Sequence, residues 1–324
     1  MKPTLALIAT GGTIAGLAED SAAPANYTAG VVDAEALIAA VPPLRELASL
    51  RVEQPCNVDS SDLTPAHWLA LAKRVQALAA DPAIAGIVVT HGTDTLEETA
   101  AFLALCHGGE TPVVLTGAMR PANALSADGP ANLYDACRVA LAAESRGRGV
   151  MVVFAGEILP ALPLSKASLG LQPYAAGAGG ALGVAGSRLR FFHPRPPATA
   201  AVLDAGACHA LPEVAILHVA AGSPPQALRD ALRHGARGVV LALPGSGTVP
   251  VAWEETITEA CSAGIRIVRG SRLASAYVTP RHQDIELGTW AAGALAPAQA
   301  RVALMVAIAA GREGLPPAAY AQAG

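Results

Sequence analysis

Short runs of valine, isoleucine and leucine alternate along the chain with longer stretches in which alanine and leucine recur at helical spacing. A run without polar alternation predicts a strand that is buried on both faces, as in a parallel sheet. In the N-terminal part these runs occupy residues 5–8, 52–58, 86–89, 112–115 and 149–154, and helices are predicted over 33–41, 65–80, 95–106 and 129–143. Because strands and helices alternate, the sequence predicts a mainly parallel sheet flanked by helices.

The pattern breaks between residues 191 and 212, where proline and alanine are abundant and a linker is expected. Beyond it the alternation resumes, with predicted strands at 214–219, 238–243 and 265–268 and predicted helices at 226–234, 253–263 and 296–310. We therefore expect an α/β protein with a larger N-terminal domain (1–190), a linker (191–212) and a smaller C-terminal α/β domain with a parallel sheet (213–324). The glycine-rich stretch 177–186 is predicted to form a loop or hairpin.

Two turns with similar chemistry follow two of the predicted strands. Ala9-Thr10-Gly11-Gly12-Thr13 comes directly after the run at 5–8, and Thr90-His91-Gly92-Thr93-Asp94-Thr95 comes directly after the run that ends at residue 89. The carboxyl ends of parallel strands lie at one edge of a sheet, which is where ligands bind in this class of fold. Two threonines brought together there, without a histidine or cysteine motif nearby, indicate acyl transfer by a hydroxyl nucleophile.

Other interpretations of these turns can be weighed from the residues. A dinucleotide site needs Gly-x-Gly-x-x-Gly, but Thr13 stands at the second glycine position. A P-loop needs Lys-Ser/Thr after its last glycine, but Leu17 and Ala18 follow Gly16. Two alternatives remain, namely that the glycine pair only forms a tight turn and that Asp94 only caps a helix. A cap needs a single oxygen, however, and the second turn offers several.

Lysine usage adds another indication. The chain has 19 arginines but only three lysines, Lys2, Lys73 and Lys166. Lys2 is terminal and Lys73 falls on the exposed side of a predicted helix, whereas Lys166 follows the strand at 149–154. Arginine keeps its proton in proteins and lysine can lose it, so a lysine retained in such a chain indicates a base. An ordinary surface lysine is the alternative.

The bulk composition narrows the class of protein. Apolar residues make up 52% of the chain, and the formal charge of −4 argues against nucleic acid as a partner. No apolar run reaches the ~18 residues that a transmembrane helix needs, and a cleaved signal peptide would remove the first turn, so we expect a cytoplasmic protein that binds no membrane. The five cysteines are scattered, and no histidine pair has zinc-ligand spacing, so neither a metal nor a cofactor is expected.

With these features the chain resembles the bacterial-type L-asparaginases. The resemblance runs nearly end to end and implies a homotetramer built as a dimer of intimate dimers, acting on a small amide substrate. The segments that carry it are Thr10-Gly11-Gly12-Thr13-Ile14-Ala15-Gly16, Asn26-Tyr27-Thr28, Asp59-Ser60-Ser61-Asp62, His91-Gly92-Thr93-Asp94-Thr95, Gly117-Ala118-Met119-Arg120-Pro121 and Ser126-Ala127-Asp128-Gly129-Pro130-Ala131-Asn132-Leu133.

The resemblance implies roles for individual residues. Thr13 matches the nucleophile that attacks the side-chain amide, and Tyr27 matches the tyrosine of a loop that closes over the site and helps to activate it. Thr93, Asp94 and Lys166 match a second hydroxyl, its carboxylate and its amine. Ser60 matches the residue that binds the substrate α-carboxylate. The substrate-binding positions expected in this way are Gly12, Ser60, Ser61, Gly92, Thr93, Asp94 and Ala118.

Three positions depart from the family pattern. Ser61 stands where many relatives have Gln or Glu, and Ser246 stands where members have either Asn or Ser. At 281–283, where relatives supply a Glu from the neighbouring subunit, the chain has no carboxylate and offers His282 or Gln283. These departures leave open how strongly the site prefers one amide over the other.

We therefore expect an amidohydrolase that converts L-asparagine and water to L-aspartate and ammonia through an acyl intermediate on Thr13, with side activity on L-glutamine. One alternative is a glutaminase-asparaginase that uses both amides comparably. The other is a non-catalytic small-ligand sensor, against which the intact set of matched polar residues argues.

Overall fold

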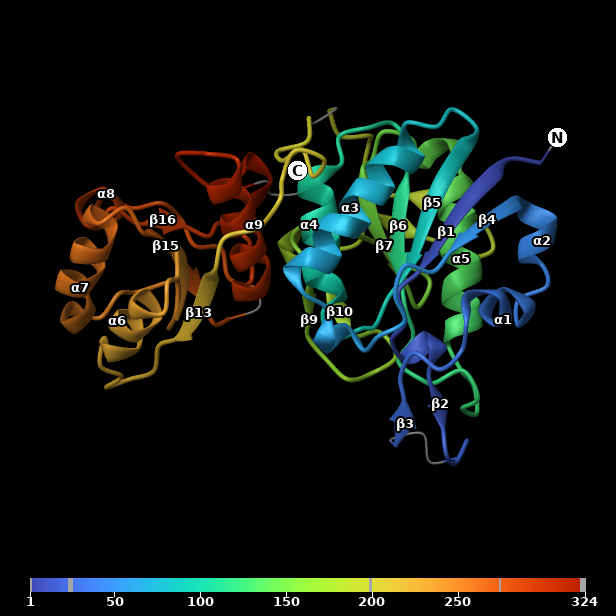
Figure 1. The fold of residues 1–324 in the computed structure, drawn as a ribbon, viewed down its shortest axis with the longest axis horizontal. Coiled ribbons are helices and arrows are strands. Elements are labelled where there is room, and N and C mark those ends of the chain that lie inside the picture. Colours follow the sequence, from blue (N-terminus) through green and yellow to red (C-terminus); the bar gives the residue numbers. More distant parts are fainter. Residues whose placement is uncertain (1, 23–25, 198–199, 274, 321–324) are drawn as a thin grey trace. The chain divides into compact units, whose positions relative to one another are not determined.

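The computed structural model describes all residues except 1, 23–25, 198–199, 274 and 321–324. The chain forms two units (Figure 1). The first comprises Met1–Ala161, Lys166–Ala175 and Ala181–Ala201, and the second comprises Leu162–Ser165, Ala176–Gly180 and Val202–Gly324. Two short segments on either side of Lys166–Ala175 therefore belong to the second unit, an excursion that the hydrophobic pattern does not predict.

An eight-stranded sheet forms the centre of the first unit, in the order β12-β11-β8-β7-β6-β5-β1-β4. The strands from β7 to β4 run parallel, and β8, β11 and β12 are added antiparallel at one edge. The expected mainly parallel sheet is confirmed. Its strands are β1 (Thr4–Ala9), β4 (Ser49–Glu53), β5 (Ile84–Thr90), β6 (Val113–Thr116), β7 (Val150–Phe154), β8 (Glu157–Pro160), β11 (Gly183–Val184) and β12 (Arg190–Phe191). Two small hairpins accompany it: β2 (Leu17–Ala18) with β3 (Tyr27–Thr28), and β9 (Ser165–Lys166) with β10 (Tyr174–Ala175).

Helices cover both faces of this sheet (Figure 1). Leu5, Leu7 and Ala9 of β1 belong to the core formed with α1 (Ala34–Ala39), α2 (Leu44–Leu47) and α5 (Gly129–Leu141). The intervening Ala6 and Ile8 are just as buried and point to the other face, where α3 (Pro65–Ala79) and α4 (Leu96–Cys106) pack. Burial on both faces is why the strands show no polar alternation.

Strand β4 is shorter than the sequence indicates and begins earlier. The pattern predicts a strand over 52–58, but β4 ends at Glu53. Pro55 lacks an amide hydrogen and cannot continue the ladder. The chain returns to the sheet only at Val58, through an isolated bridge to Gly11. The stretch 177–186, predicted as a loop or hairpin, includes β11, which pairs with β8 and β12.

The second unit contains a four-stranded parallel sheet in the order β13-β14-β15-β16. Its elements are β13 (Val214–His218), α6 (Gln226–Arg233), β14 (Gly238–Leu243), α7 (Val251–Ser262), β15 (Arg266–Ser271), α8 (His282–Leu287), β16 (Trp290–Ala291) and α9 (Pro297–Ala309). The expected smaller α/β unit with a parallel sheet is confirmed. Between β12 and β13, the described residues 192–197 and 200–213 form neither helix nor strand. None of the described helices is long and apolar enough to cross a membrane.

Candidate active site

Three backbone turns meet at the carboxyl ends of β1 and β5. A Cβ atom at Gly12 would lie 2.2 Å from the Cα of Gly92, and a Cβ atom at Gly92 would lie 2.7 Å from Oγ of Ser60. Gly12 also has a φ of 81°, which side chains rarely adopt. Both glycines are therefore needed for close approach, and they bring the neighbouring Thr13 and Thr93 into one region with Ser60.

A fourth segment follows strand β6. Ala118 is fully buried, and the turn after it is fixed by Asp128, whose carboxylate accepts the backbone N–H groups of Met119 and Arg120 at 2.9 Å each. A Cβ atom at Gly129 would lie 3.4 Å from Cβ of Ala118. The Gly117–Pro121 motif is thus a rigid turn at the carboxyl end of the next parallel strand.

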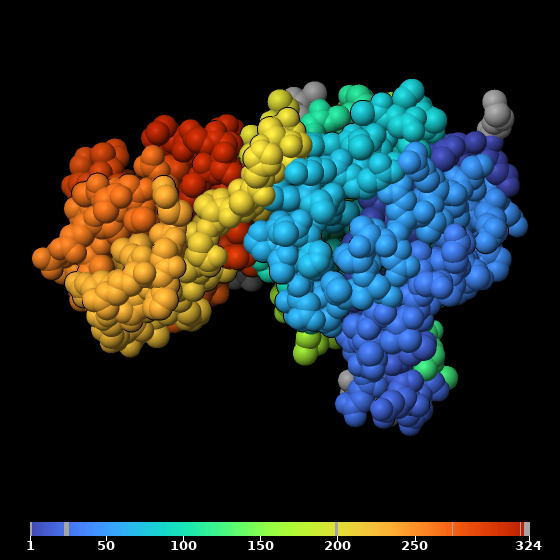
Figure 2. Space-filling view, in the orientation of Figure 1, coloured from blue at the N-terminus to red at the C-terminus, as the bar shows by residue number. Residues whose placement is uncertain are grey.

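Thr13 is paired with Tyr27. The Thr13 Oγ1 lies 2.7 Å from the Tyr27 hydroxyl oxygen, and either group can donate this hydrogen bond. Thr13 is 6% exposed, whereas Tyr27 is 37% exposed on the β2–β3 hairpin, which projects from the first unit (Figure 2). Asn123 supports this hairpin by exchanging two hydrogen bonds of 2.8 Å with the backbone of Ala18. The hairpin therefore places a phenol directly on the Thr13 hydroxyl.

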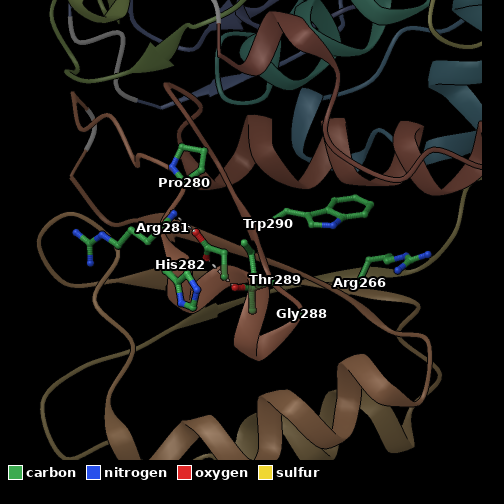
Figure 3. Close-up of a pocket in the computed structure, with 9 residues that line it drawn as sticks. Arg266, Pro280, Arg281, His282, Gly288, Thr289 and Trp290 are labelled. Carbon is green, nitrogen blue, oxygen red and sulfur yellow. Dashed lines mark hydrogen bonds between the residues drawn. The ribbon is translucent and has the colours of Figure 1, made fainter.

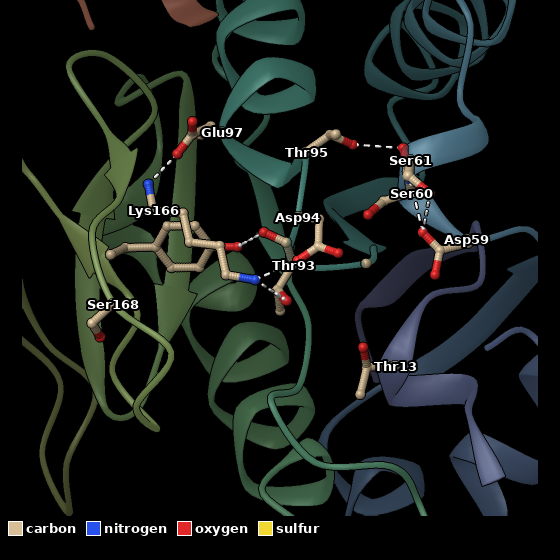
Figure 4. Close-up of polar contacts among 12 residues, drawn as sticks. Thr13, Asp59, Ser60, Ser61, Thr93, Asp94, Thr95, Glu97, Lys166 and Ser168 are labelled. Carbon is tan, nitrogen blue, oxygen red and sulfur yellow. Dashed lines mark hydrogen bonds and ion pairs between the residues drawn. The ribbon is translucent and has the colours of Figure 1, made fainter. Parts of the chain in front are cut away.

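The second threonine lies in a charged group. Nζ of Lys166 donates to Oγ1 of Thr93 at 2.9 Å and to Oδ1 of Asp94 at 2.5 Å. The Lys166 side chain is 15% exposed and the Asp94 side chain 63% exposed. In Figure 4, Thr93 and Asp94 are drawn between Lys166 on one side and Thr13 and Ser60 on the other. The pairing with lysine contradicts the alternative that Asp94 only caps α4.

The Asp59-Ser60-Ser61 turn completes the arrangement (Figure 4). Thr95, the residue before α4, donates through Oγ1 to the backbone carbonyl of Ser60 at 2.8 Å. Ser60 is 3% exposed. Ser61 is exposed and donates both its backbone N–H (2.9 Å) and its hydroxyl (2.7 Å) to Oδ1 of Asp59. The Ser61 hydroxyl is thus bonded to Asp59.

Two residues that the sequence reasoning missed lie behind the charged group. Glu97 accepts the backbone N–H of Lys166, and burial raises the pKa of its carboxyl to about 7. The hydroxyl of Tyr174 donates to the backbone carbonyl of Thr93 at 2.8 Å. Glu97 lies in the first turn of α4, shortly after the Thr93-Asp94-Thr95 motif, and that position could have suggested it. Tyr174 gave no comparable signal.

His91 belongs to the structure of the turn. It is fully buried, and burial lowers its pKa to about 4, so the ring is neutral. The Trp68 indole donates to the Thr99 hydroxyl (2.9 Å), which lies 2.8 Å from His91 Nε2, while Nδ1 lies 2.7 Å from the Gly92 carbonyl oxygen. This chain of contacts leaves both ring nitrogens engaged within the protein.

The positions that depart from the family pattern at 246 and 281–283 lie in the second unit. Nη2 of Arg281 donates to Oγ of Ser246 at 2.6 Å. Gln283 donates to Glu254 at 2.9 Å, and Nδ1 of His282 lies 3.1 Å from Glu286. The side chains that were expected to replace a carboxylate therefore have partners within their own unit.

A shallow pocket of about 570 Å³ lies on the second unit (Figure 3). It is lined by Arg266, Pro280, Arg281, His282, Asp284, Ile285, Gly288, Thr289 and Trp290. The guanidinium groups of Arg266 and Arg281 point away from each other in Figure 3. Within the described part of the chain, no three or more His, Cys, Asp or Glu side chains are placed to hold a metal ion.

Comparison with known proteins defines the class. The family model for the N-terminal domain of asparaginase matches residues 4–196, and that for the glutaminase/asparaginase C-terminal domain matches residues 213–314. The chain therefore belongs to the asparaginase family, and it is an amidohydrolase.

Individual relatives cover nearly the whole chain. The chain is 37% identical to L-asparaginase 2 of Escherichia coli strain K12, over 94% of this chain and 89% of the relative. It is 35% identical to a glutaminase-asparaginase of Pseudomonas aeruginosa, over 93% of this chain and 85% of the relative. The crystal structure of a probable cytoplasmic L-asparaginase from Campylobacter jejuni superimposes with a TM-score of 0.91 at 38% identity, covering 95% of each chain.

Proposed function

We propose that this protein hydrolyses L-asparagine to L-aspartate and ammonia through an acyl intermediate on Thr13. The observation that carries the proposal is the meeting of the Thr13 hydroxyl with a separate Thr93–Asp94–Lys166 group at one edge of a parallel sheet. The family membership and the names of the relatives support the same activity.

The first half-reaction forms the acyl intermediate. The Thr13 oxygen attacks the side-chain amide carbon of the substrate, while Tyr27 orients the hydroxyl through its 2.7 Å contact. A threonine hydroxyl is a poor nucleophile at its own pKa and needs a neighbouring base. The Thr93–Asp94–Lys166 group handles the protons, taking one from the attacking hydroxyl and giving one to the nitrogen that leaves as ammonia.

The second half-reaction uses the same groups in the same order. Water replaces Thr13 as the attacking oxygen and the Thr93 group takes its proton. The bond between Thr13 and the acyl group then breaks, the Thr93 group returns a proton to the Thr13 oxygen, and aspartate is released. Backbone N–H groups of the glycine turns stabilise the negative charge on the carbonyl oxygen in both steps; the Gly12 N–H is not one of them, because it donates to the Val58 carbonyl at 3.0 Å.

Substrate binding is assigned to the three turns. Ser60 binds the α-carboxylate, and Asp94, the exposed carboxylate of the site, binds the α-ammonium. Gly12, Gly92 and Ala118 are buried in these turns, and we assign them to substrate binding through their backbone groups. Ser61 contributes at the rim, where it is bonded to Asp59.

Glutamine is proposed as a slower second substrate. Ser61 and Ser246 are smaller than the Gln or Glu and the Asn found in relatives, and one methylene in a pocket changes discrimination by only ~1–3 kcal/mol. The relatives include enzymes named glutaminase-asparaginase. Measured kcat/KM should favour asparagine by less than ~10⁴; a larger preference contradicts this part of the proposal.

A homotetramer and a cytoplasmic location are part of the proposal. The location is supported by the likeness to the C. jejuni protein, which is named as probably cytoplasmic, although another relative, from Haemophilus influenzae, is named periplasmic. Light scattering on the purified protein tests the assembly, and fractionation of the native host tests the compartment.

The central test is ammonia release by the purified protein from L-asparagine, L-glutamine and their D-forms. Trapping the acyl-enzyme at low pH and locating the modified peptide by mass spectrometry tests the role of Thr13. Absence of ammonia release from every amide would support the sensor alternative, and a label on a residue other than Thr13 would overturn the mechanism.

A further inference from the structure

The β9–β10 hairpin holds Thr93 from two directions. Lys166, on β9, donates to the Thr93 hydroxyl at 2.9 Å. Tyr174, on the paired strand β10, donates to the Thr93 backbone carbonyl at 2.8 Å. One small hairpin thus contacts both the reactive side chain and the backbone of the same residue.

Tyr174 is well suited to a fixed contact. Its side chain is buried, and its ring packs edge-on against Phe154 with centroids 5.4 Å apart. Burial, together with the carboxylates of Glu97 and Asp94, raises the pKa of Tyr174 well above its usual value. The hydroxyl therefore keeps its proton and remains a donor across the working pH range.

The hairpin that carries Tyr174 is itself braced. The backbone N–H of Ala167 donates to the Pro173 carbonyl at 2.7 Å, and Gln172 donates to Glu157 on β8. The side-chain oxygen of Gln172 also accepts the Tyr174 backbone N–H at 3.3 Å. Because these contacts fix the backbone at Tyr174, the position of its hydroxyl is fixed too.

The carbonyl that Tyr174 holds belongs to a particular peptide group. The Thr93–Asp94 peptide joins the two residues whose side chains contact Lys166. A shift of this peptide would move the Thr93 hydroxyl and the Asp94 carboxylate together relative to the Lys166 amine. Misplacement of a reacting group by about 1 Å costs ~10²-fold in rate.

We propose that Tyr174 is a positioning residue for catalysis, which fixes the Thr93–Asp94 peptide so that both side chains face Lys166. The inference rests on the proposed function, because it assigns Tyr174 a part in the same reaction. Tyr174 acts through Thr93, and its loss is expected to affect turnover rather than substrate affinity.

The test compares two Tyr→Phe variants, each of which removes a tyrosine hydroxyl that donates a hydrogen bond to a backbone carbonyl. Tyr174→Phe removes the contact to Thr93, and Tyr320→Phe removes a contact of 2.9 Å to Ala291 in the second unit. For Tyr174→Phe we expect kcat for L-asparagine to fall ~10- to 100-fold while KM stays within about twofold. Tyr320→Phe should keep kcat within about twofold of wild type, although its Tm should change about as much as that of Tyr174→Phe.

A second pair of variants tests the other anchor of the hairpin and does not depend on how well Tyr174→Phe folds. Glu97→Gln keeps an oxygen that can accept the Lys166 backbone N–H, whereas Glu97→Met removes it. The kcat should fall about tenfold or more for Glu97→Met and less than about threefold for Glu97→Gln.

Three results would overturn the inference while leaving the proposed function intact, provided that the wild-type protein hydrolyses asparagine. The first is a kcat of Tyr174→Phe within twofold of wild type. The second is a fall of kcat in Tyr320→Phe equal to that in Tyr174→Phe. The third is a KM of Tyr174→Phe that rises in proportion to its loss of kcat. Lack of hydrolysis by the wild-type protein would instead overturn the proposed function itself.

Discussion

Each of the two units contains a charged cluster, and the two clusters use their hydrogen-bonding capacity differently. In the second unit, Asp284 accepts two hydrogen bonds of 2.7 Å from Arg269, and it also accepts from the Arg281 backbone and the Thr289 hydroxyl. Arg269 is 1% exposed and donates further to the carbonyls of Ser246, Gly247 and Thr279. This cluster is saturated by its own chain.

The cluster of the first unit is not closed in this way. Asp94 contacts Lys166 through Oδ1, yet 63% of its side chain remains exposed. Tyr27, the partner of Thr13, is 37% exposed. A saturated buried pair can only hold loops in place, whereas charges and hydroxyls that still face solvent can receive a ligand. The comparison therefore separates a structural cluster from a candidate site.

The largest effect is expected from loss of a threonine hydroxyl in the site. Thr13→Ala and Thr93→Val should each lower kcat by ~10³ or more, and the double variant should be little worse, because the two groups serve the same step. Tm should change little, since neither hydroxyl supports the core. Steady-state ammonia release measures kcat, and thermal denaturation measures Tm. Near wild-type turnover in Thr13→Ala would exclude Thr13 as the nucleophile.

Loss of a charge from the saturated cluster should instead affect stability. Asp284→Ala leaves Arg269 buried without its partner and should lower the free energy of unfolding by about 3–5 kcal/mol. The matched control is Glu286→Ala, which removes an exposed carboxylate beside His282 and should cost less than ~0.5 kcal/mol. Urea denaturation measures both, and equal effects would contradict the distinction between the clusters.

Lys166 tests whether the open cluster needs a charge or a proton carrier. Lys166→Arg keeps the charge but cannot release a proton, so kcat should fall ~10²-fold or more, nearly as far as in Lys166→Met. Retention of most activity by the arginine variant would show that the amine acts only electrostatically.

Glu97 should give a smaller effect that depends on pH. Its pKa in the folded protein is about 7, raised by burial from an ordinary value near 4.5, so the folded state holds a proton that the unfolded chain has lost. The stability that this group contributes is present below about pH 4.5 and is lost as the pH rises towards 7. Between pH 5 and 8, the free energy of unfolding of the wild-type protein should therefore fall by about 1–3 kcal/mol more than that of Glu97→Gln. Parallel stability curves for the two proteins would contradict this assignment.

Much of the fold could be predicted, because the strands and helices are encoded locally. The order of the strands in the sheet and the strands at its edge were harder to predict from the sequence. Strand β8 is only four residues long, and β11 and β12 have two residues each, so no periodic pattern could develop. Strand β4 also ended at Glu53, just before Pro55, whereas the predicted strand ran to residue 58. The roles assigned to the site residues stay predictions until the variants are measured.

The sequence by itself determined that strands buried on both faces would place two glycine- and threonine-rich turns at one edge of a parallel sheet, because that information lies in contiguous residues. Only the tertiary structure decided which side chains reach those turns. Lys166 and Thr93 are 73 residues apart, Tyr174 and Thr93 are 81 apart, and Thr95 reaches Ser60 across 35. These contacts depend on sheet order and on where a short hairpin packs, and neither leaves a periodic signal in the chain.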